Sequence, residues 1–341
     1  MPRRRHLAAA SALMAIALVL SACGSQTSGD DADESSSDGA FPVTIKHAFG
    51  KTTIKDTPKR VVTIGTGSTG TAIALGNTPV GTDEYEWGAD ESGHLPWVRE
   101  AVEEAGDELP EQFTGGTELD IEAVLKLDPD VILAPWSGIT KKQYELLSDF
   151  APTVAYPNKP WTTDWKTQMT MIGKALGKEE QAKAEIDKIT KRLKKVGDEN
   201  PEFSEHTFAY IYTDGPGTLG VYMPTEQRVE MLTMMGLKVA PEIKDLPRDD
   251  GADWKLIGLE NADKLDDADL VFTWYANDKA RKDVTSQPLY AQIPAIERDT
   301  VVTSNDHSFV TASSIINPLT VPWSVDRYVP KIKKAIAKSG D

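Results

Sequence analysis

Residues 178–196 read KEEQAKAEIDKITKRLKKV, a charged segment with a regular apolar repeat. The apolar residues stand four, three, four and three positions apart, at Ala182, Ile186, Ile189, Leu193 and Val196. Such intervals place one apolar stripe along an α-helix of about 3.6 residues per turn. Gly177 closes an earlier helical pattern and Gly197 follows the last apolar residue, as glycine commonly does at helix ends. The segment predicts one helix about 30 Å long, either on the surface of one large domain or between two lobes.

The sequences on the two sides of this helix resemble each other. Residues 121–133 read IEAVLKLDPDVIL and residues 259–272 read LENADKLDDADLVF, so Glu, Lys, Leu and Asp recur in register with one inserted residue. A strand pattern followed by a glycine-rich turn occurs at Val61–Ile64 and again at Phe208–Tyr212. Internal repetition of this kind favours two similar α/β lobes, with the helix between them.

The N-terminus has the pattern of a secretion signal. Arg3–Arg5 form a basic start, and Leu7–Leu20 are an apolar run too short to span a bilayer comfortably. The run ends in Leu-Ser-Ala before Cys23, the only cysteine, and this segment resembles the lipobox of bacterial lipoproteins. The resemblance implies a signal peptide at 1–22, a lipid anchor on Cys23 and a position on the outer face of the cytoplasmic membrane. An ordinary secretory cleavage site beside an incidental cysteine is the alternative.

Composition limits the partners of the exported chain. Residues 23–40 are mostly Ser, Gly, Asp and Glu, which predicts a flexible acidic tether. With its one cysteine assigned to lipid, the exported chain depends on its apolar cores and not on a disulfide. Removing the three signal arginines changes the net charge from −16 to −19, since 34 of the 37 basic residues then remain against 53 acidic ones. Such a charge disfavours nucleic acid and anionic lipid surfaces as partners.

A glycine motif offers a competing interpretation. Residues 65–70 read GTGSTG, a G-x-G-x-x-G pattern after a strand, and Asp83 stands near the position of the ribose-binding acid of dinucleotide folds. The helix expected at Thr69–Leu75 is barely two turns long, which is short for packing a pyrophosphate on its N-terminus. The alternative is a tight strand-to-helix turn at the edge of a ligand cleft.

Four segments carry a resemblance to a known family: PKRVVT at 58–63, Val80-Gly81, the segment 122–133 and FAPTVAY at 150–156. In this order, with the long helix and the lipobox, they resemble the iron–siderophore substrate-binding proteins of ABC importers, a family that includes cobalamin and haem binders. The likeness extends from about Pro42 to Ala337. Near its end, residues 313–323 resemble the segment before the family's last helix, although Asn317 stands where the family often has a second proline.

The resemblance implies an α/β fold with two Rossmann-like lobes, joined by a single long helix, with the ligand cleft between them. We expect lobes at 41–176 and 201–341 and the bridging helix at 177–200. It further implies a monomeric binding protein, with no enzymatic activity and no cofactor, that captures a ferric siderophore and delivers it to an ABC permease for iron uptake. A cobalamin or haem receptor on the same fold, and a dinucleotide-dependent enzyme, stay as alternatives.

The repeated glutamates match positions at which the family docks on arginines of the permease, one in each lobe. These are Glu122 and Glu260. Arg–carboxylate contacts are directional and often bidentate, so two of them fix orientation as well as affinity. The alternative is that both are first-turn carboxylates favoured by the helix dipole.

The expected ligand site lies in loops that follow strands, because ligands of open α/β lobes sit beyond the carboxyl ends of the strands. Aromatic and hydroxyl side chains in these loops suit a large ligand. The candidates are Thr66, Ser68, Tyr85, Trp87 and Trp136 in the first half, and Tyr212, Trp274, Tyr275, Arg281, His307 and Phe309 in the second. Trp254 and Trp323 stand within apolar runs and are expected to be structural.

Charge favours a hydroxamate siderophore. A tris-catecholate ferric complex carries about three negative charges and needs a cluster of cations. The loops offer mainly aromatics and hydroxyls, with Arg248, Arg281 and Lys282 as the plausible cations. No metal site is predicted, because the histidines, at positions 6, 47, 94, 206 and 307, show no paired spacing. No H-E-x-x-H or G-x-S-x-G motif favours a hydrolase.

Overall fold

The computed structural model describes residues 40–213, 215–248 and 252–339. The predicted signal peptide (1–22), the predicted lipid site Cys23 and residues 24–39 of the predicted tether lie outside the described residues. No helix in the described part of the chain is long and apolar enough to cross a membrane.

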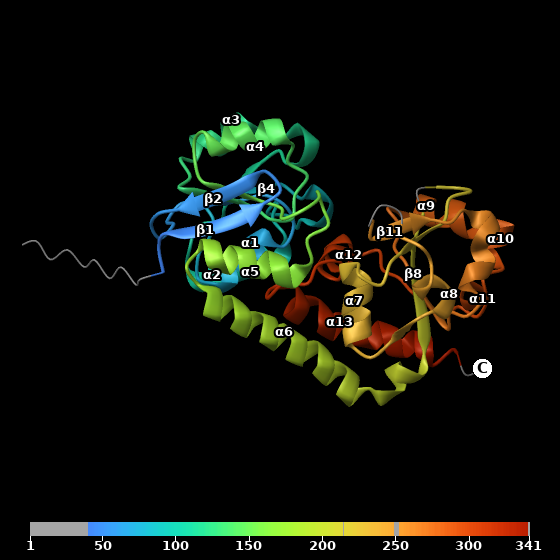
Figure 1. The fold of residues 1–341 in the computed structure, drawn as a ribbon. Helices are drawn as coiled ribbons and strands as arrows, with labels where there is room; N and C mark the ends of the chain where they lie inside the picture. The colour runs from blue at the N-terminus through green and yellow to red at the C-terminus, as the bar shows by residue number, and fades with distance from the viewer. Residues whose placement is uncertain (1–39, 214, 249–251, 340–341) are drawn as a thin grey trace, which may run out of the picture. The chain divides into compact units, whose positions relative to one another are not determined.

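The N-terminal lobe is built on a parallel five-stranded sheet (Figure 1). Its strand order is β5-β4-β3-β6-β7. The strands are β3 (Val61–Thr63), β4 (Gly81–Asp83), β5 (Glu111–Phe113), β6 (Val131–Ala134) and β7 (Thr153–Ala155). An antiparallel hairpin of β1 (Val43–His47) and β2 (Gly50–Ile54) precedes this sheet.

Both faces of this sheet are covered, which explains why β3, β6 and β7 are buried at every residue. Val61, Leu133 and Val154 pack in one apolar cluster with the hairpin, α1 (Ser68–Ala74) and α5 (Trp165–Ala175). Val62, Ile132 and Ala155 pack in another with α3 (Ile121–Lys126) and α4 (Lys141–Ser148). Neighbouring residues of a strand therefore serve opposite cores. The remaining elements of the lobe are η1 (Glu86–Gly88), α2 (Pro96–Ala105) and η2 (Gly116–Glu118).

The C-terminal lobe has a second sheet with a parallel centre, in the order β11-β9-β8-β12-β13. Strands β8 (Thr207–Tyr212), β12 (Leu270–Phe272) and β13 (Val301–Val302) run parallel, and β10 (Lys238–Val239) pairs in parallel with the start of β8. Strands β9 (Gly220–Tyr222) and β11 (Trp254–Leu256) extend the sheet in antiparallel fashion. The helices of this lobe are η3 (Pro201–Glu205), α7 (Gln227–Met234), α8 (Pro241–Lys244), η4 (Leu259–Leu265), α9 (Asp278–Thr285), α10 (Pro288–Ala291), α11 (Pro294–Glu297), α12 (His307–Ala312) and α13 (Thr320–Ile336).

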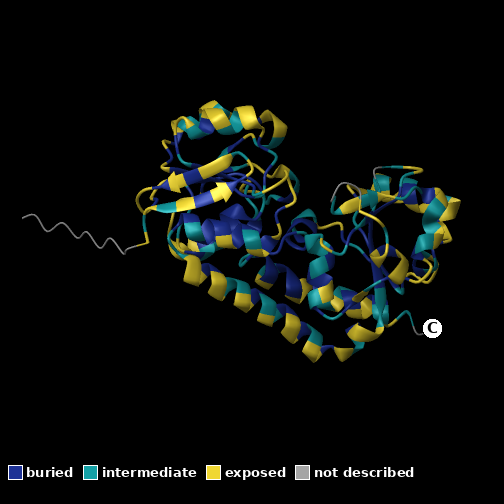
Figure 2. Ribbon diagram, in the orientation of Figure 1, coloured by how far each residue is buried: buried dark blue, intermediate teal, exposed yellow. Residues whose placement is uncertain are grey.

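The predicted long helix is α6 (Glu179–Glu199), and it joins the two lobes. Ala182, near its start, belongs to an apolar cluster of the N-terminal lobe, whereas Ile189, Leu193 and Val196 belong to a cluster of the C-terminal lobe. The helix contacts α5 of the N-terminal lobe and α7 and α13 of the C-terminal lobe. Its opposite face is exposed, as the yellow segments in Figure 2 show. One apolar stripe is thus divided between two cores, and the predicted α/β fold of two lobes joined by a long helix is confirmed.

The internal repeat is also visible in the topology. Strands β3, β6 and β7 occupy the same successive positions in their sheet as β8, β12 and β13 in theirs. The repeated segments form α3 followed by β6, and η4 followed by β12. At the other edge the lobes differ in strand direction: β4 and β5 continue their sheet in parallel, whereas β9 and β11 occupy the corresponding positions in antiparallel fashion.

The lobes also meet through a small apolar cluster. Trp97 and Val98 of α2 pack with Ala312 of α12, and the rings of Trp97 and Trp323 lie 5.4 Å apart. Near this cluster the Ser308 hydroxyl donates to the Gly88 carbonyl at 2.9 Å. The last helices of the chain therefore connect the two lobes a second time.

Candidate functional site

A pocket of about 530 Å³ lies between the two lobes. Its N-terminal wall comes from Trp136, which follows β6, and from residues 160–164, which precede α5. Its C-terminal wall comes from the end of β9, the start of α7 and the approach to β11, namely Tyr222, Thr225, Glu226, Gln227, Arg228, Arg248, Ala252, Asp253 and Trp254. A volume of this size is typical of a small-molecule site.

Two tryptophans form the N-terminal wall. Trp136 and Trp161 meet edge to face, with ring centroids 4.8 Å apart. Trp161 is 44% exposed and has a positive φ of 61°. A Cβ at Gly138 would lie 2.5 Å from the Trp161 ring, so only glycine lets this ring rest on the backbone. The wall is an exposed aromatic surface held by close backbone contact.

Two aromatic side chains, Tyr222 and Trp254, line the opposite wall, and Tyr212 contacts both without lining the pocket. Tyr222 lies 5.1 Å from Tyr212, and Tyr212 meets the ring of Trp254 edge to face at 6.2 Å. Trp254 is 50% exposed, although the sequence predicted a structural role for it. That prediction is wrong because β11 is an edge strand of three residues, whose side chains have no further strand to cover them.

The described lining of the pocket includes a partly buried cation, Arg228. Its guanidinium lies over the ring of Tyr222, 4.6 Å from the centroid, and pairs with Glu226. The Glu226 carboxylate also accepts the Arg228 backbone N–H at 2.7 Å and caps α7. Burial raises the pKa of Glu226, with the charge of Arg228 opposing that rise. Burial would lower the pKa of Arg228, but the Glu226 carboxylate raises it above its ordinary value, so Arg228 stays charged.

The charges that line the pocket nearly cancel. Among its described residues two arginines, Arg228 and Arg248, stand against three carboxylates, Asp164, Glu226 and Asp253, which gives a net charge of −1. Arg248 forms an ion pair with Asp253 and Arg228 one with Glu226. The cavity offers broad aromatic faces and no surplus of positive charge.

Several predicted site residues meet at a different contact between the lobes. Trp87 of η1 stacks on His307 with ring centroids 4.3 Å apart, and meets Trp274 edge to face at 5.4 Å. These three rings come from both lobes, but they are not among the lining of the interlobe pocket. They form an aromatic contact that connects η1 to α12 and to the end of β12.

Thr66, Ser68 and Tyr85 lie at the glycine-rich turn. Ser68 is fully buried, and the Thr66 carbonyl accepts from the Gln168 amide at 3.0 Å. Thr66 and Tyr85 line a cavity of only about 30 Å³. Tyr85 is partly exposed; burial raises its pKa, and the nearby charge of Arg228 opposes the rise. Tyr85 therefore brings the N-terminal lobe close to the cation of the C-terminal wall.

The glycines of this turn serve close packing. A Cβ at Gly65 would lie 1.8 Å from the Trp136 carbonyl oxygen, and one at Gly70 would lie 2.9 Å from the Asn317 side chain. Gly65 and Gly67 also have positive φ angles of 89° and 91°. The residues that open α1 are buried, so its N-terminus does not face an open phosphate site. The tight-turn interpretation explains these glycines better than a dinucleotide site does.

Asp83 lies beneath the same turn, where its carboxylate accepts the Gly65 N–H at 3.1 Å. Burial raises the pKa of Asp83 to about 6. Because this pKa is higher in the folded than in the unfolded chain, the stability it contributes is present below about pH 4 and is lost as the pH rises through about 6.

Replacing Asp83 by asparagine is expected to remove this pH dependence. At pH 7 Asp83→Asn should raise the free energy of unfolding by roughly 1–3 kcal/mol, with little effect at pH 4. Denaturant unfolding of both proteins at the two pH values measures this change in the free energy of unfolding. Asp90→Asn is the matched control: although burial opposes, hydrogen bonds from Ser92 and Arg99 lower the pKa of Asp90, so its loss should destabilise. A destabilised Asp83→Asn variant at pH 7 would contradict the expectation.

Three further candidates lie away from the interlobe pocket, in the C-terminal lobe. The Tyr275 hydroxyl hydrogen-bonds that of Tyr290 at 2.7 Å, and both residues line a second pocket together with Arg281. Phe309 is 4% exposed and packs edge to face on Tyr328 in the core. The structure thus places Tyr275 and Arg281 together, but apart from Trp136 and Arg228.

Glu122 and Glu260 are exposed and stand in the first turns of α3 and η4, one in each lobe. In the described ranges neither forms an ion pair. Within those ranges, too, no group of three or more His, Cys, Asp or Glu side chains could hold a metal ion.

Sequence reasoning did not identify Arg228, Tyr222 or Trp161 as site residues. Arg228 stands in a plain helix start, TEQRVE, with no motif around it. One available signal was the position of Tyr222 at the end of a strand pattern, Gly220–Tyr222, before a new helix. The pairing of Glu226 with Arg228 becomes evident only from their contact.

Comparison with known proteins gives consistent matches. A model of the periplasmic binding protein family matches residues 61–306, which include strands of both lobes. The probable siderophore-binding lipoprotein YfiY of Bacillus subtilis is 30% identical over 250 residues, covering 67% of this chain and 70% of YfiY. The Fe(3+)-citrate-binding protein YfmC of the same organism is 26% identical over 298 residues, covering 86% of this chain and 88% of YfmC. The structure of Streptococcus pneumoniae PiaA in complex with ferrichrome has a TM-score of 0.78 and 30% identity, covering 86% of this chain and 99% of PiaA.

Proposed function

Because this chain belongs to the periplasmic binding protein family, a family of substrate-binding proteins and not of enzymes, we propose that it captures a ferric siderophore and delivers it to an ABC permease. The proposed ligand is a hydroxamate complex, and its proposed site is the interlobe pocket. The proposed anchor is lipid on Cys23, which would hold the protein on the outer face of the cytoplasmic membrane.

The observation that carries this proposal is the combination of aromatic walls with nearly balanced charge. The described lining has a net charge of −1, and its two arginines are both paired with carboxylates. The chelating groups of a tris-hydroxamate neutralise the ferric ion, whereas a tris-catecholate leaves about three negative charges that such a pocket cannot balance. Exposed rings of Trp161 and Trp254 supply broad apolar faces for the organic part of the ligand.

The relatives support a siderophore or other ferric complex as the ligand. PiaA was solved with ferrichrome bound, and YfiY is named as a probable siderophore-binding lipoprotein. YfmC, which is named as a ferric citrate binder, is 26% identical and widens the range of complexes to be tested. The charge of this chain's own pocket is the reason for preferring the hydroxamate.

Titration of the full chain with a ligand panel tests the proposal. Ferrichrome and ferrioxamine B should quench its tryptophan fluorescence saturably below about 1 μM, because Trp136, Trp161 and Trp254 line the pocket. Ferric enterobactin, ferric citrate, haemin, cobalamin and NAD serve as competitors of other classes. Saturable quenching by a catecholate and not by either hydroxamate would overturn the proposed ligand class. Binding of NAD alone would instead favour a dinucleotide site at the glycine turn.

The proposed contacts with the permease are Glu122 and Glu260. Both are exposed first-turn carboxylates at equivalent positions of the internal repeat. Two carboxylates on separate lobes would meet two cationic pockets of a permease only in one orientation.

A further inference from the structure

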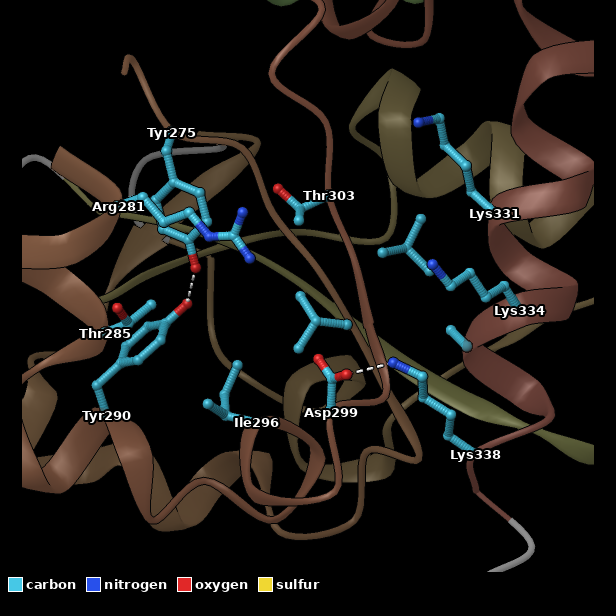
Figure 3. A pocket seen from close by; sticks show the side chains of 13 residues that line it. Tyr275, Arg281, Thr285, Tyr290, Ile296, Asp299, Thr303, Lys331, Lys334 and Lys338 are labelled. Carbon is cyan, nitrogen blue, oxygen red and sulfur yellow. Dashed lines mark hydrogen bonds and ion pairs between the residues drawn. The ribbon is translucent and has the colours of Figure 1, made fainter. Parts of the chain in front are cut away.

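A second pocket of about 380 Å³ lies wholly within the C-terminal lobe (Figure 3). Arg281 of α9 reaches it from one side, and Lys331 and Lys334 of α13, with Lys338 just after that helix, reach it from the other. All its lining residues come from positions 275–338, so it is separate from the interlobe pocket.

The charge of this pocket is opposite to that of the molecule. Its described lining holds four cations and one carboxylate, Asp299, for a net charge of +3, whereas the whole chain has −16. Like charges gathered around a cavity raise the local potential and concentrate counter-ions. The mutual repulsion of four cations around one carboxylate raises the free energy of the folded protein. An anion bound between them would lower it.

Only one of these cations has an acidic partner. Lys338 pairs with Asp299, as the dashed line in Figure 3 shows. Among the described residues Arg281 and Lys334 form no ion pair, while Lys331 contacts only the Ser304 hydroxyl at 3.5 Å and the ring of Phe309 at 5.1 Å. The α9 carboxylate Asp283 is already bound to Lys279 at 2.5 Å. The positive charge is therefore available to a ligand.

The pocket also offers an apolar surface and a spare hydroxyl. Ile296, Val301 and the ring of Tyr290 line it between the two cationic sides. The Thr303 hydroxyl is buried and has no hydrogen-bond partner among the described residues. A buried polar atom without a partner costs free energy, which a ligand oxygen would recover. An occupant would thus combine a carbon body with oxygen atoms of negative charge.

We propose that this pocket binds a small organic anion with two or more carboxylate or phosphate groups, independently of the ligand in the interlobe pocket. The planar guanidinium of Arg281 suits two oxygens of one anionic group. The lysine ammonium groups are point charges that would attract a second anionic group of the same ligand. The volume is sufficient for a molecule of small metabolite size.

Calorimetric titration of the full chain, purified in detergent at low ionic strength, tests the proposal with iron-free citrate and inorganic pyrophosphate. At least one should bind saturably, and the affinity should fall as salt is added. The double variant Arg281→Gln/Lys334→Gln should weaken that binding by at least about tenfold. The preferred probe shows whether carboxylate or phosphate is the recognised group.

The control is Lys282→Gln/Lys333→Gln, which removes two positive charges from the same helices but outside the pocket, and should leave the affinity within about threefold. Acetate, with one charge, should bind more weakly than citrate. Absence of binding by both probes, equal losses in the two double variants, or equal affinity for acetate would each overturn the proposal. Arg228→Gln should retain the anion; its loss there would assign the anion to the interlobe pocket. A chain that binds no siderophore can still bind the anion, so the two proposals fail separately.

Discussion

Replacing Arg228 by glutamine is expected to weaken binding of a ferric hydroxamate by about 30-fold or more. The change removes the cation that lies over Tyr222 and leaves the Glu226 carboxylate buried without its partner. Removing one member of a buried, hydrogen-bonded charge pair costs about 2–5 kcal/mol, much of it from the charge left behind. Fluorescence titration with ferrichrome and thermal unfolding of the same samples measure the two effects.

Two further variants separate the loss of binding from a loss of folding. Arg228→Gln/Glu226→Gln removes both charges together, so it should recover much of the stability while the affinity stays low. Arg327→Gln is the matched control, since Arg327 also stacks on an aromatic ring, Trp323 at 3.8 Å, but lies outside the pocket. Wild-type affinity in Arg228→Gln, or an equal loss in Arg327→Gln, would show that Arg228 does not act in the ligand site.

Reversing both proposed docking charges, in Glu122→Lys/Glu260→Lys, is expected to abolish siderophore uptake while affinity for the ligand stays unchanged. Each lysine would repel the cation that its glutamate is proposed to meet, and like charges brought together cost several kcal/mol. Both positions are exposed, so folding should tolerate the exchange. Uptake of radioactive iron by cells that carry only the variant measures the first effect, and fluorescence titration measures the second.

The control for this experiment reverses two other exposed first-turn carboxylates, in Glu180→Lys/Glu242→Lys. It changes the net charge by the same amount at unrelated positions, so it should leave uptake close to that of the wild type. Full uptake by the Glu122/Glu260 variant would remove both residues from the permease contact. Loss of uptake by both variants would show only an effect of total charge.

The two lobes and the long helix between them could be predicted from the sequence, because local patterns determine both. The stripe from Ala182 to Val196 predicts α6, and the structure divides that stripe between two cores, as a bridging helix requires. The similarity of residues 121–133 to residues 259–272 predicts a strand at an equivalent position in each lobe. These strands are β6 and β12, which hold the same place in their sheets. Apolar periodicity and sequence repetition are properties of residues close together in the chain. They can therefore be recognised without the tertiary structure.

Strand-end residues were harder to assign because neighbouring side chains of a strand point to opposite faces. Trp274 packs beside the C-terminal core that faces α13, whereas Tyr275, one residue later, belongs to the cluster on the other face. The position of both residues just after β12 therefore predicts the part of the lobe in which they lie. It does not predict which pocket or core each side chain faces.

The family, the long helix and the glycine turn follow from the sequence by itself, because each depends on a contiguous pattern. The composition of the proposed ligand pocket was decided by the tertiary structure alone. Trp136 follows β6, Tyr222 ends β9 and Arg228 stands in the first turn of α7, so the three come from separate parts of the chain. The charge of Arg228 is balanced by Glu226 only through their contact in space, and that balance is what favours one class of ligand over another.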